Sequence, residues 1–156
     1  YAKAGMAGPA AAWLFRMVNA GIGANAYAYN SLINASSRVG DPEKAIGWLR
    51  RMEASRLCPD IVSHNSIINA YAKASLPDDA AKWVNRMRDQ QLVPPNVISY
   101  ATVITACGRA RHGQHALAEG MVSQMVRDKL QPDEQIVRTL SNMLGAERLR
   151  ALESQL

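Results

Sequence analysis

Basic side chains recur along this chain at a fixed interval and are its clearest candidates for chemistry. Lys3, Arg38 and Lys73 lie 35 residues apart, and Arg109 holds the corresponding place after a short insertion. The chain has 18 lysines and arginines against 13 acidic residues, a formal net charge of +5. Four cations in one register indicate a polyanionic partner. A cation at a helix C-terminus is also favoured by the helix dipole without any ligand, so both interpretations stay open.

Other residue types that could do chemistry are sparse. Cys58 and Cys107 have no CxxC spacing, and we expect both to be small, buried or half-buried apolar residues. His112 and His115 are spaced HxxH, but they fall in an irregular insertion without a third ligand, which argues against a metal site. Neither an HxE with CxxC signature nor clustered carboxylates occur. We therefore expect no catalysis, metal or cofactor.

The elements that position these side chains repeat every 35 residues. The register is kept by Trp13, Trp48 and Trp83, by Met17, Met52 and Met87, and by Ala10, Ala45 and Ala80. A fixed period of this length is typical of a solenoid, in which each unit packs only on its neighbours. We expect the tryptophans and methionines to be packing residues. No stretch approaches the roughly 20 apolar residues of a membrane helix, so no membrane insertion is expected.

Each copy is predicted to hold two amphipathic helices. Apolar spacings of i, i+3, i+4 occur at Tyr29, Leu32 and Ile33 and again at Ala45, Trp48, Leu49 and Met52. Asp41 can cap the second helix, with Pro42 in its first turn, and we expect the segment 75–79 to do the same in the next copy.

The copies align on the tryptophans. The predicted organisation is the second half of a truncated repeat over 1–25, repeats over 26–60, 61–96 and 97–133, and a degenerate repeat or cap over 134–156. The repeat over 97–133 contains an insertion. Because the chain starts inside a repeat, we expect it to be a piece of a longer protein.

The runs YNSLINA at 29–35 and HNSIINAYAKA at 64–74 resemble the first helix of a pentatricopeptide repeat. The Met and Pro-Asp endings of the copies resemble its close. The period of 35 and the tryptophan in the second helix differ from the tetratricopeptide repeat. The resemblance implies an all-α fold, a right-handed superhelical solenoid of antiparallel helical hairpins. It also implies a non-catalytic, sequence-selective single-stranded RNA-binding module of a mitochondrion or plastid.

In the family, the fifth residue of a repeat and its last residue read one base. By this resemblance the reading pairs are Asn30 with Asp60, Asn65 with Asn96, and Ala101 with Asp133. The first pair suggests uracil, and the second suggests cytosine, with uracil next best, so a pyrimidine-containing RNA is implied. Ala101 has no polar side-chain atom, so the third repeat is expected to be weakly selective or silent. Arg138 occupies the equivalent place of the tail.

The resemblance also assigns contacts around each base. Apolar residues at the second place would sandwich the bases, and the recurring cations would contact phosphate. The sandwiching residues are Tyr27, Val62 and Ile98, and the phosphate contacts are Lys3, Arg38, Lys73 and Arg109.

Simpler interpretations stay open. Asp60, Asn96 and Asp133 precede helices and could serve only as N-caps, and Asn30 and Asn65 could be polar residues on a solvated face. The eroded code at Ala101 leaves a different class of function open, a protein-binding scaffold or structural subunit of a large organellar complex.

Overall fold

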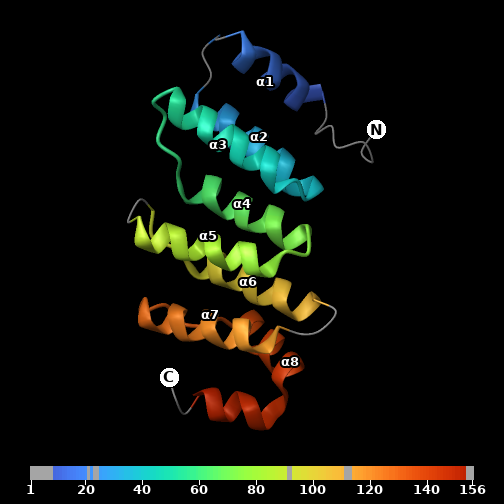
Figure 1. Ribbon diagram of the computed structural model, residues 1–156, viewed down its shortest axis with the longest axis vertical. Coiled ribbons are helices and arrows are strands. Elements are labelled where there is room, and N and C mark those ends of the chain that lie inside the picture. The colour runs from blue at the N-terminus through green and yellow to red at the C-terminus, as the bar shows by residue number, and fades with distance from the viewer. Residues whose placement is uncertain (1–8, 21, 23–24, 91–92, 111–113, 154–156) are drawn as a thin grey trace. The chain divides into compact units, whose positions relative to one another are not determined.

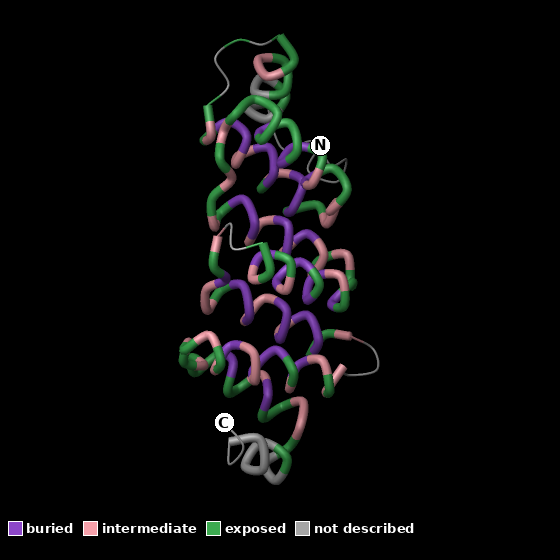
Figure 2. Tube along the Cα trace, turned by 60° about the vertical axis from the view of Figure 1, so that its left-hand side comes forward, coloured by how far each residue is buried: buried purple, intermediate pink, exposed green. Residues whose placement is uncertain are grey.

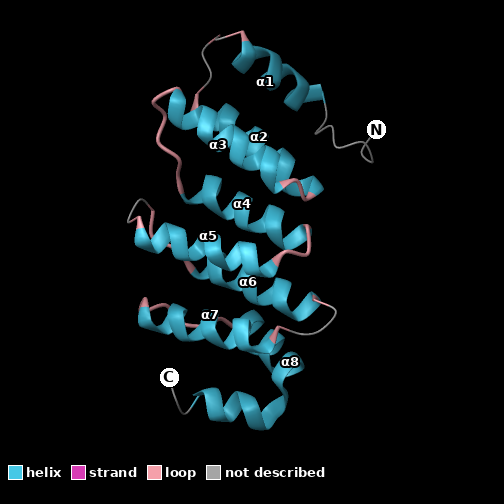
Figure 3. Cartoon of the chain, viewed as in Figure 1, coloured by secondary structure: helices cyan, strands magenta, loops and turns pink. Residues whose placement is uncertain are grey.

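The computed structural model describes residues 9–20, 22, 25–90, 93–110 and 114–153. This part of the chain is all-α and has no strand (Figures 1 and 3). Its helices are α1 (Pro9–Asn19), α2 (Ala26–Val39), α3 (Pro42–Ala54), α4 (Ile61–Lys73), α5 (Pro77–Asp89), α6 (Val97–Arg109), α7 (His115–Arg127) and α8 (Glu134–Glu153). The predicted fold class, two helices per copy, is confirmed.

The helices fall into two compact units, Tyr1–Ala74 with α1 to α4 and Ser75–Leu156 with α5 to α8. In the first unit α2 packs against α3, its partner in the same copy, and against α4, the first helix of the next copy. In the second unit α6 packs in the same way against α7 and α8 (Figure 1). Each unit thus brings the first helices of successive copies side by side.

Side-chain caps explain where most of these helices begin. Asn25, Asp41, Asp60, Asn96 and Asp133 each accept a hydrogen bond from the backbone N–H three residues further on. Such a bond satisfies one of the N–H groups that the first turn leaves without a helical partner. The expected cap of α3 by Asp41 is confirmed.

The cap expected at the start of α5 is wrong in part. Leu76 occupies the N-cap position, and no side chain caps this helix. Pro77 in the first turn lacks an N–H, which removes one of the donors that a cap would satisfy. Asp78 and Asp79 supply carboxylates to the positive end of the helix dipole, as expected.

The periodic apolar residues form the core. Trp48 and Met52 of α3 and Trp83 and Met87 of α5 are all buried. Figure 2 shows how buried and exposed residues alternate along the helices. The prediction that these tryptophans and methionines are packing residues is confirmed for both copies; the side chain of Trp13 lies outside the described part.

The tryptophan column continues in α7 as a methionine. Ala118, Met121, Val122 and Met125 repeat the i, i+3, i+4, i+7 spacing of the buried residues of α5, and all four are buried. Met121 therefore fills the place of Trp83, displaced by the insertions between the two copies. The packing pattern persists after the tryptophan has been lost.

Cys107 is buried in α6, as predicted, and burial together with the charge of Asp78 raises the pKa of its thiol to about 11. The same expectation is wrong for Cys58, which is exposed. Cys58 follows the left-handed turn at Arg56, where φ is 58°, and so lies in the connection after α3 rather than on a packed helix face.

Helix α8 covers α6, the first helix of the preceding copy. Ile136 and Leu140 of α8 are buried, and α8 packs on α6 and α7. The helix is interrupted at Gly145, where φ is 76°. No helix in the described ranges is long and apolar enough to cross a membrane.

Candidate nucleic-acid interface

The first reading pair is joined by direct contact. Asn30 lies in the second turn of α2, and Asp60 is the N-cap of α4. The Asn30 Nδ2 atom donates to Asp60 at 3.2 Å from Oδ1 and 3.1 Å from Oδ2. This contact arises because α2 and α4 pack side by side, which places the start of each first helix beside its predecessor. Two residues 30 apart in sequence are thereby brought to one site.

A third residue, Ser63, completes this site. The buried Ser63 hydroxyl donates to Asn30 Oδ1, and its oxygen accepts from the Asp60 backbone N–H at 3.2 Å. The Ser63 N–H in turn donates to Asp60 Oδ1 at 2.9 Å, which makes a reciprocal capping box. The sequence reading missed Ser63, although a serine three residues after a capping aspartate was the available signal.

The carboxylate at this site is stabilised in its charged form. Partial burial alone would raise the pKa of Asp60, but the hydrogen bonds from Ser63 and Asn30 together outweigh burial and lower the pKa below its usual 3.8. Asp60 is therefore an anion at neutral pH and can only accept hydrogen bonds. It serves both as N-cap and as partner of Asn30, so the two interpretations of this residue are compatible.

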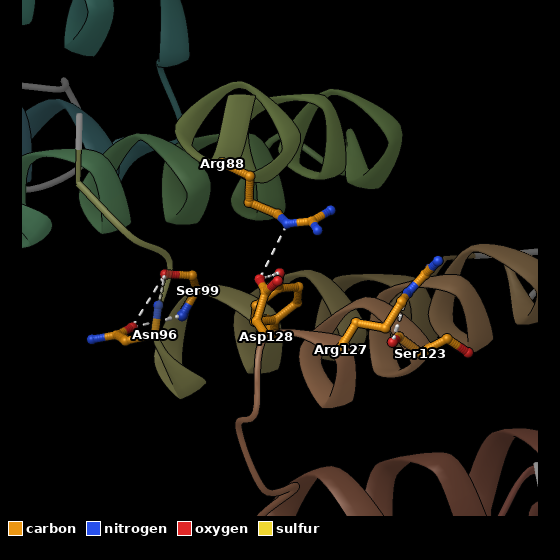
Figure 4. A network of polar contacts seen from close by, with 7 residues as sticks. Arg88, Asn96, Ser99, Ser123, Arg127 and Asp128 are labelled. Atoms are coloured by element: carbon orange, nitrogen blue, oxygen red, sulfur yellow. Dashed lines mark hydrogen bonds and ion pairs between the residues drawn. The ribbon is translucent and has the colours of Figure 1, made fainter. Parts of the chain in front are cut away.

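The corresponding residues of the later copies differ. Asn65 belongs to the first unit and Asn96 to the second. Asn96 caps α6 through a capping box with Ser99, with both hydrogen bonds at 3.1 Å (Figure 4). In the third pair, Asp133 accepts from the Ile136 N–H at 2.8 Å, and the methyl group of Ala101 offers no hydrogen bond. Asn30 with Asp60 is the pair whose contact is described.

The residues expected to sandwich bases are exposed. Tyr27 is 77% exposed, Val62 53% and Ile98 60%, each in the first turn of its helix. Single exposed apolar residues are common on protein surfaces, but their recurrence at the same place of three helices is not explained by packing. In α8 the same place is held by Gln135, so the apolar column ends there.

The basic column also lies on the surface. Arg38, Lys73 and Arg109 are exposed in the last turns of α2, α4 and α6. Lys73 Nζ donates to the Arg38 carbonyl oxygen at 3.3 Å, so this cation stabilises the end of the preceding first helix. Lys3 lies outside the described residues.

A polar stripe joins the two columns. Residues at the second, fifth, ninth and thirteenth places are spaced for one helix face, and Tyr27, Asn30, Asn34 and Arg38 occupy it in α2. The ninth place, which the sequence reading did not single out, is held by Asn34, Asn69 and Thr105. Asn69 Nδ2 donates to Ser37 Oγ at 2.8 Å and so ties α4 to α2. Asn30 and Arg38 are eight residues apart in sequence, which corresponds to roughly 12 Å along the helix axis.

The hydroxyl groups of two buried tyrosines make contacts that hold the start of α2 and of α6. The Tyr29 and Ser55 hydroxyls are 2.8 Å apart. The corresponding Tyr100 donates to Asp128. The Oδ2 atom of Asp128 lies 3.2 Å from Arg88 Nε (Figure 4). Burial and the Asp128 carboxylate both raise the pKa of Tyr100. These contacts hold the residue next to each reading place against the end of the second helix of the same copy.

In the described ranges, no group of three His, Cys, Asp or Glu side chains is placed to hold a metal ion. His115 begins α7, and His112 lies outside the described part.

Comparison with family models identifies the repeats. A pentatricopeptide repeat domain model matches residues 14–74, and a PPR repeat family model matches residues 59–109. Together they cover more than half of the chain. The chain belongs to the pentatricopeptide repeat family. Comparison with curated proteins by sequence found no match.

Solved structures show the same fold. The pentatricopeptide repeat protein PPR10 in complex with an 18-nt psaJ RNA element is 28% identical, with a TM-score of 0.73 over 91% of this chain and 21% of that chain. PPR10 from maize gives 27% identity and a TM-score of 0.75 over 90% and 20%. The PPR domain of Arabidopsis thaliana protein-only RNase P 1 in complex with tRNA is 17% identical, with a TM-score of 0.77 over 99% of this chain and 82% of that chain. The chain thus spans about a fifth of the length of PPR10.

The contact between Asn30 and Asp60 predicts a pH-dependent coupling in the free protein. In a double-mutant cycle of Asn30→Ala and Asp60→Ala, we expect a coupling of roughly 0.5–1 kcal/mol in the free energy of unfolding at pH 7. Because the folded pKa of Asp60 is lowered, its stabilising contribution is present above pH 3.8 and is lost as the pH falls through the lower folded value. Chemical denaturation at several pH values measures both.

A matched cycle of Asn34→Ala with Asp60→Ala serves as control, since Asn34 is exposed one turn further along the same helix. Its coupling is expected to be near zero. Equal coupling in both cycles would contradict a specific contact between Asn30 and Asp60.

Proposed function

We propose that this chain is a sequence-selective, non-catalytic single-stranded RNA-binding module of a mitochondrion or plastid. The observation that carries the proposal is the direct contact between Asn30 and Asp60, the two residues to which the family resemblance assigns base reading. The solved complex of PPR10 with an RNA element supports the proposal, because 91% of this chain is similar to a part of PPR10. The location in an organelle rests on the family resemblance.

The proposed reading units are the copies over 26–60, 61–96 and 97–133. Asn30 with Asp60 reads uracil, and Asn65 with Asn96 reads cytosine, with uracil next best. Asp133 acts without a polar partner in Ala101, so the third copy contributes little selectivity. Arg138 at the equivalent place of α8 is exposed and belongs to the cap.

The geometry of Asn30 suits an edge-on contact with a base. One N–H of its amide is directed at Asp60, and its oxygen accepts from Ser63. Each of the two amide atoms keeps one further hydrogen-bonding position, so the half-buried side chain can still offer a donor and an acceptor. Tyr27 and Val62, exposed at the starts of α2 and α4, provide apolar surfaces for stacking against the base.

Affinity is expected to be low for so few copies. Three base stacks contribute about 1–3 kcal/mol each, whereas association costs an estimated ~4–15 kcal/mol. Binding by this chain alone should therefore be weak and best measured at low salt. Tight binding would require further repeats.

The proposal predicts that pyrimidine RNA binds through the reading asparagines. Replacing both, in Asn30→Ala with Asn65→Ala, should weaken binding of a short oligo(U) by about ten- to thirtyfold, because each lost hydrogen bond is worth about 1 kcal/mol. Fluorescence anisotropy at low salt measures the dissociation constants.

The control is Asn19→Ala with Gln90→Ala, which removes two exposed amides at the ends of α1 and α5, outside the reading places, and should weaken binding less than threefold, or by about 0.6 kcal/mol. A double variant that binds oligo(U) as tightly as the wild type would overturn the base-reading assignment. Absence of RNA binding together with capture of a polypeptide would favour the scaffold alternative.

The basic column predicts a specific salt dependence. Each cation that contacts a phosphate of a single strand contributes roughly 0.7 to the slope of log affinity against log salt. Arg38→Ala and Lys73→Ala should each reduce the magnitude of this slope by roughly 0.7. Arg50→Ala removes the same charge from an exposed place of α3 and should leave the slope unchanged. Equal slopes in all three variants would show that Arg38 and Lys73 do not contact phosphate and only stabilise helix ends.

A further inference from the structure

Ser63 controls which way the Asn30 amide faces, and we infer that this buried hydroxyl is a positioning residue for base selection. The inference rests on the proposed RNA-binding function and extends it to a residue outside the reading pair. It follows from the direction of each hydrogen bond at the site.

The two partners of Asn30 fix its amide from opposite sides. Asp60 can only accept, so the atom that faces it must be the Asn30 Nδ2 donor. The oxygen on the other side of the amide then accepts from the Ser63 hydroxyl. A flipped amide would place its oxygen against the carboxylate and lose both attractive contacts. The orientation is therefore determined by a carboxylate and a hydroxyl together.

Ser63 is itself held so that its proton is available. Its oxygen accepts the Asp60 backbone N–H, which orients the lone pairs away from Asn30. The hydroxyl carries one proton, and Asn30 Oδ1 is its nearest acceptor, while Asp60 Oδ1 lies at 3.0 Å. The side chain is fully buried, so water does not compete for this proton.

The amide orientation matters because uracil and cytosine differ by an exchange of donor and acceptor. Uracil presents the O4 acceptor beside the N3–H donor, whereas cytosine presents the N4–H donor beside the N3 acceptor. An amide that is free to flip can satisfy either edge from the same position. An amide held in one orientation can satisfy only one of them. Fixing the flip thus converts a general pyrimidine contact into a selective one.

In the other copies, too, a serine at the place of Ser63 occurs together with an asparagine at the preceding reading place. The residue three places after the last residue of a repeat is serine where the preceding reading residue is asparagine: Ser63 follows Asn30, and Ser99 follows Asn65. Where the reading residue is Ala101, with no amide to orient, this place is held by Ile136. A capping role alone does not explain the difference, since Asp133 caps α8 without a serine.

The test compares oligo(U) with oligo(C) binding by Ser63→Ala, Ser63→Thr and wild-type chains. Loss of one hydrogen bond should reduce the ratio of the two affinities by about three- to tenfold in Ser63→Ala. Ser63→Thr keeps the hydroxyl and should restore the ratio. Asp41→Ala serves as a control, because it removes the cap of α3 without touching Asn30 and should leave the ratio unchanged.

A second measurement needs no RNA. The two Nδ2 protons of Asn30 should give well-separated NMR resonances in the wild type and in Ser63→Thr, and closer, broader ones in Ser63→Ala, where the amide is held from one side only. Unchanged resonances and an unchanged ratio in Ser63→Ala would overturn the inference while Asn30-dependent RNA binding still supports the proposed function. If Asn30→Ala binds RNA as tightly as the wild type, both the inference and the proposed base reading are overturned.

Discussion

The hydrogen bond from a helix N-terminus to its capping side chain is the contact on which the rest of the interface depends. Asp60 must accept the Ser63 N–H for α4 to begin where it does. The same carboxylate accepts from the Asn30 amide and, together with the Ser63 hydroxyl, orients that amide. Because one residue satisfies a helix end and orients a side chain of the preceding copy, local folding and the geometry of the candidate site cannot vary independently.

Packing of successive first helices turns a sequence period into spatial columns. Within each unit the first helix of one copy lies beside that of the next, so residues at equal places become neighbours. The bond from Lys73 to the Arg38 carbonyl shows this directly, since the two residues are 35 apart. Exposed apolar, reading and basic places recur in this order along the first helices, whereas the tryptophan and methionine places are buried in the second helices.

The period and the amphipathic spacing were enough to predict the helices and most of the core, because burial follows the 3.6-residue repeat. The pairing of Asn30 with Asp60 required the family resemblance. Ser63 was missed because a single serine is common and its role depends on a contact across 33 residues. Cys58 was misjudged because apolar character alone does not show whether a residue lies on a helix face or beyond its end.

Photocrosslinking of an RNA that carries 4-thiouridine to the wild-type chain, followed by identification of the crosslinked peptides, tests the central claim most directly. The account predicts crosslinks at the start of α2 and α4, around Tyr27, Asn30 and Val62, whose yield at a subsaturating RNA concentration falls about three- to tenfold in Asn30→Ala. Crosslinks confined to the second helices α3 and α5, or equal crosslinking in the variant, would contradict base reading by this site.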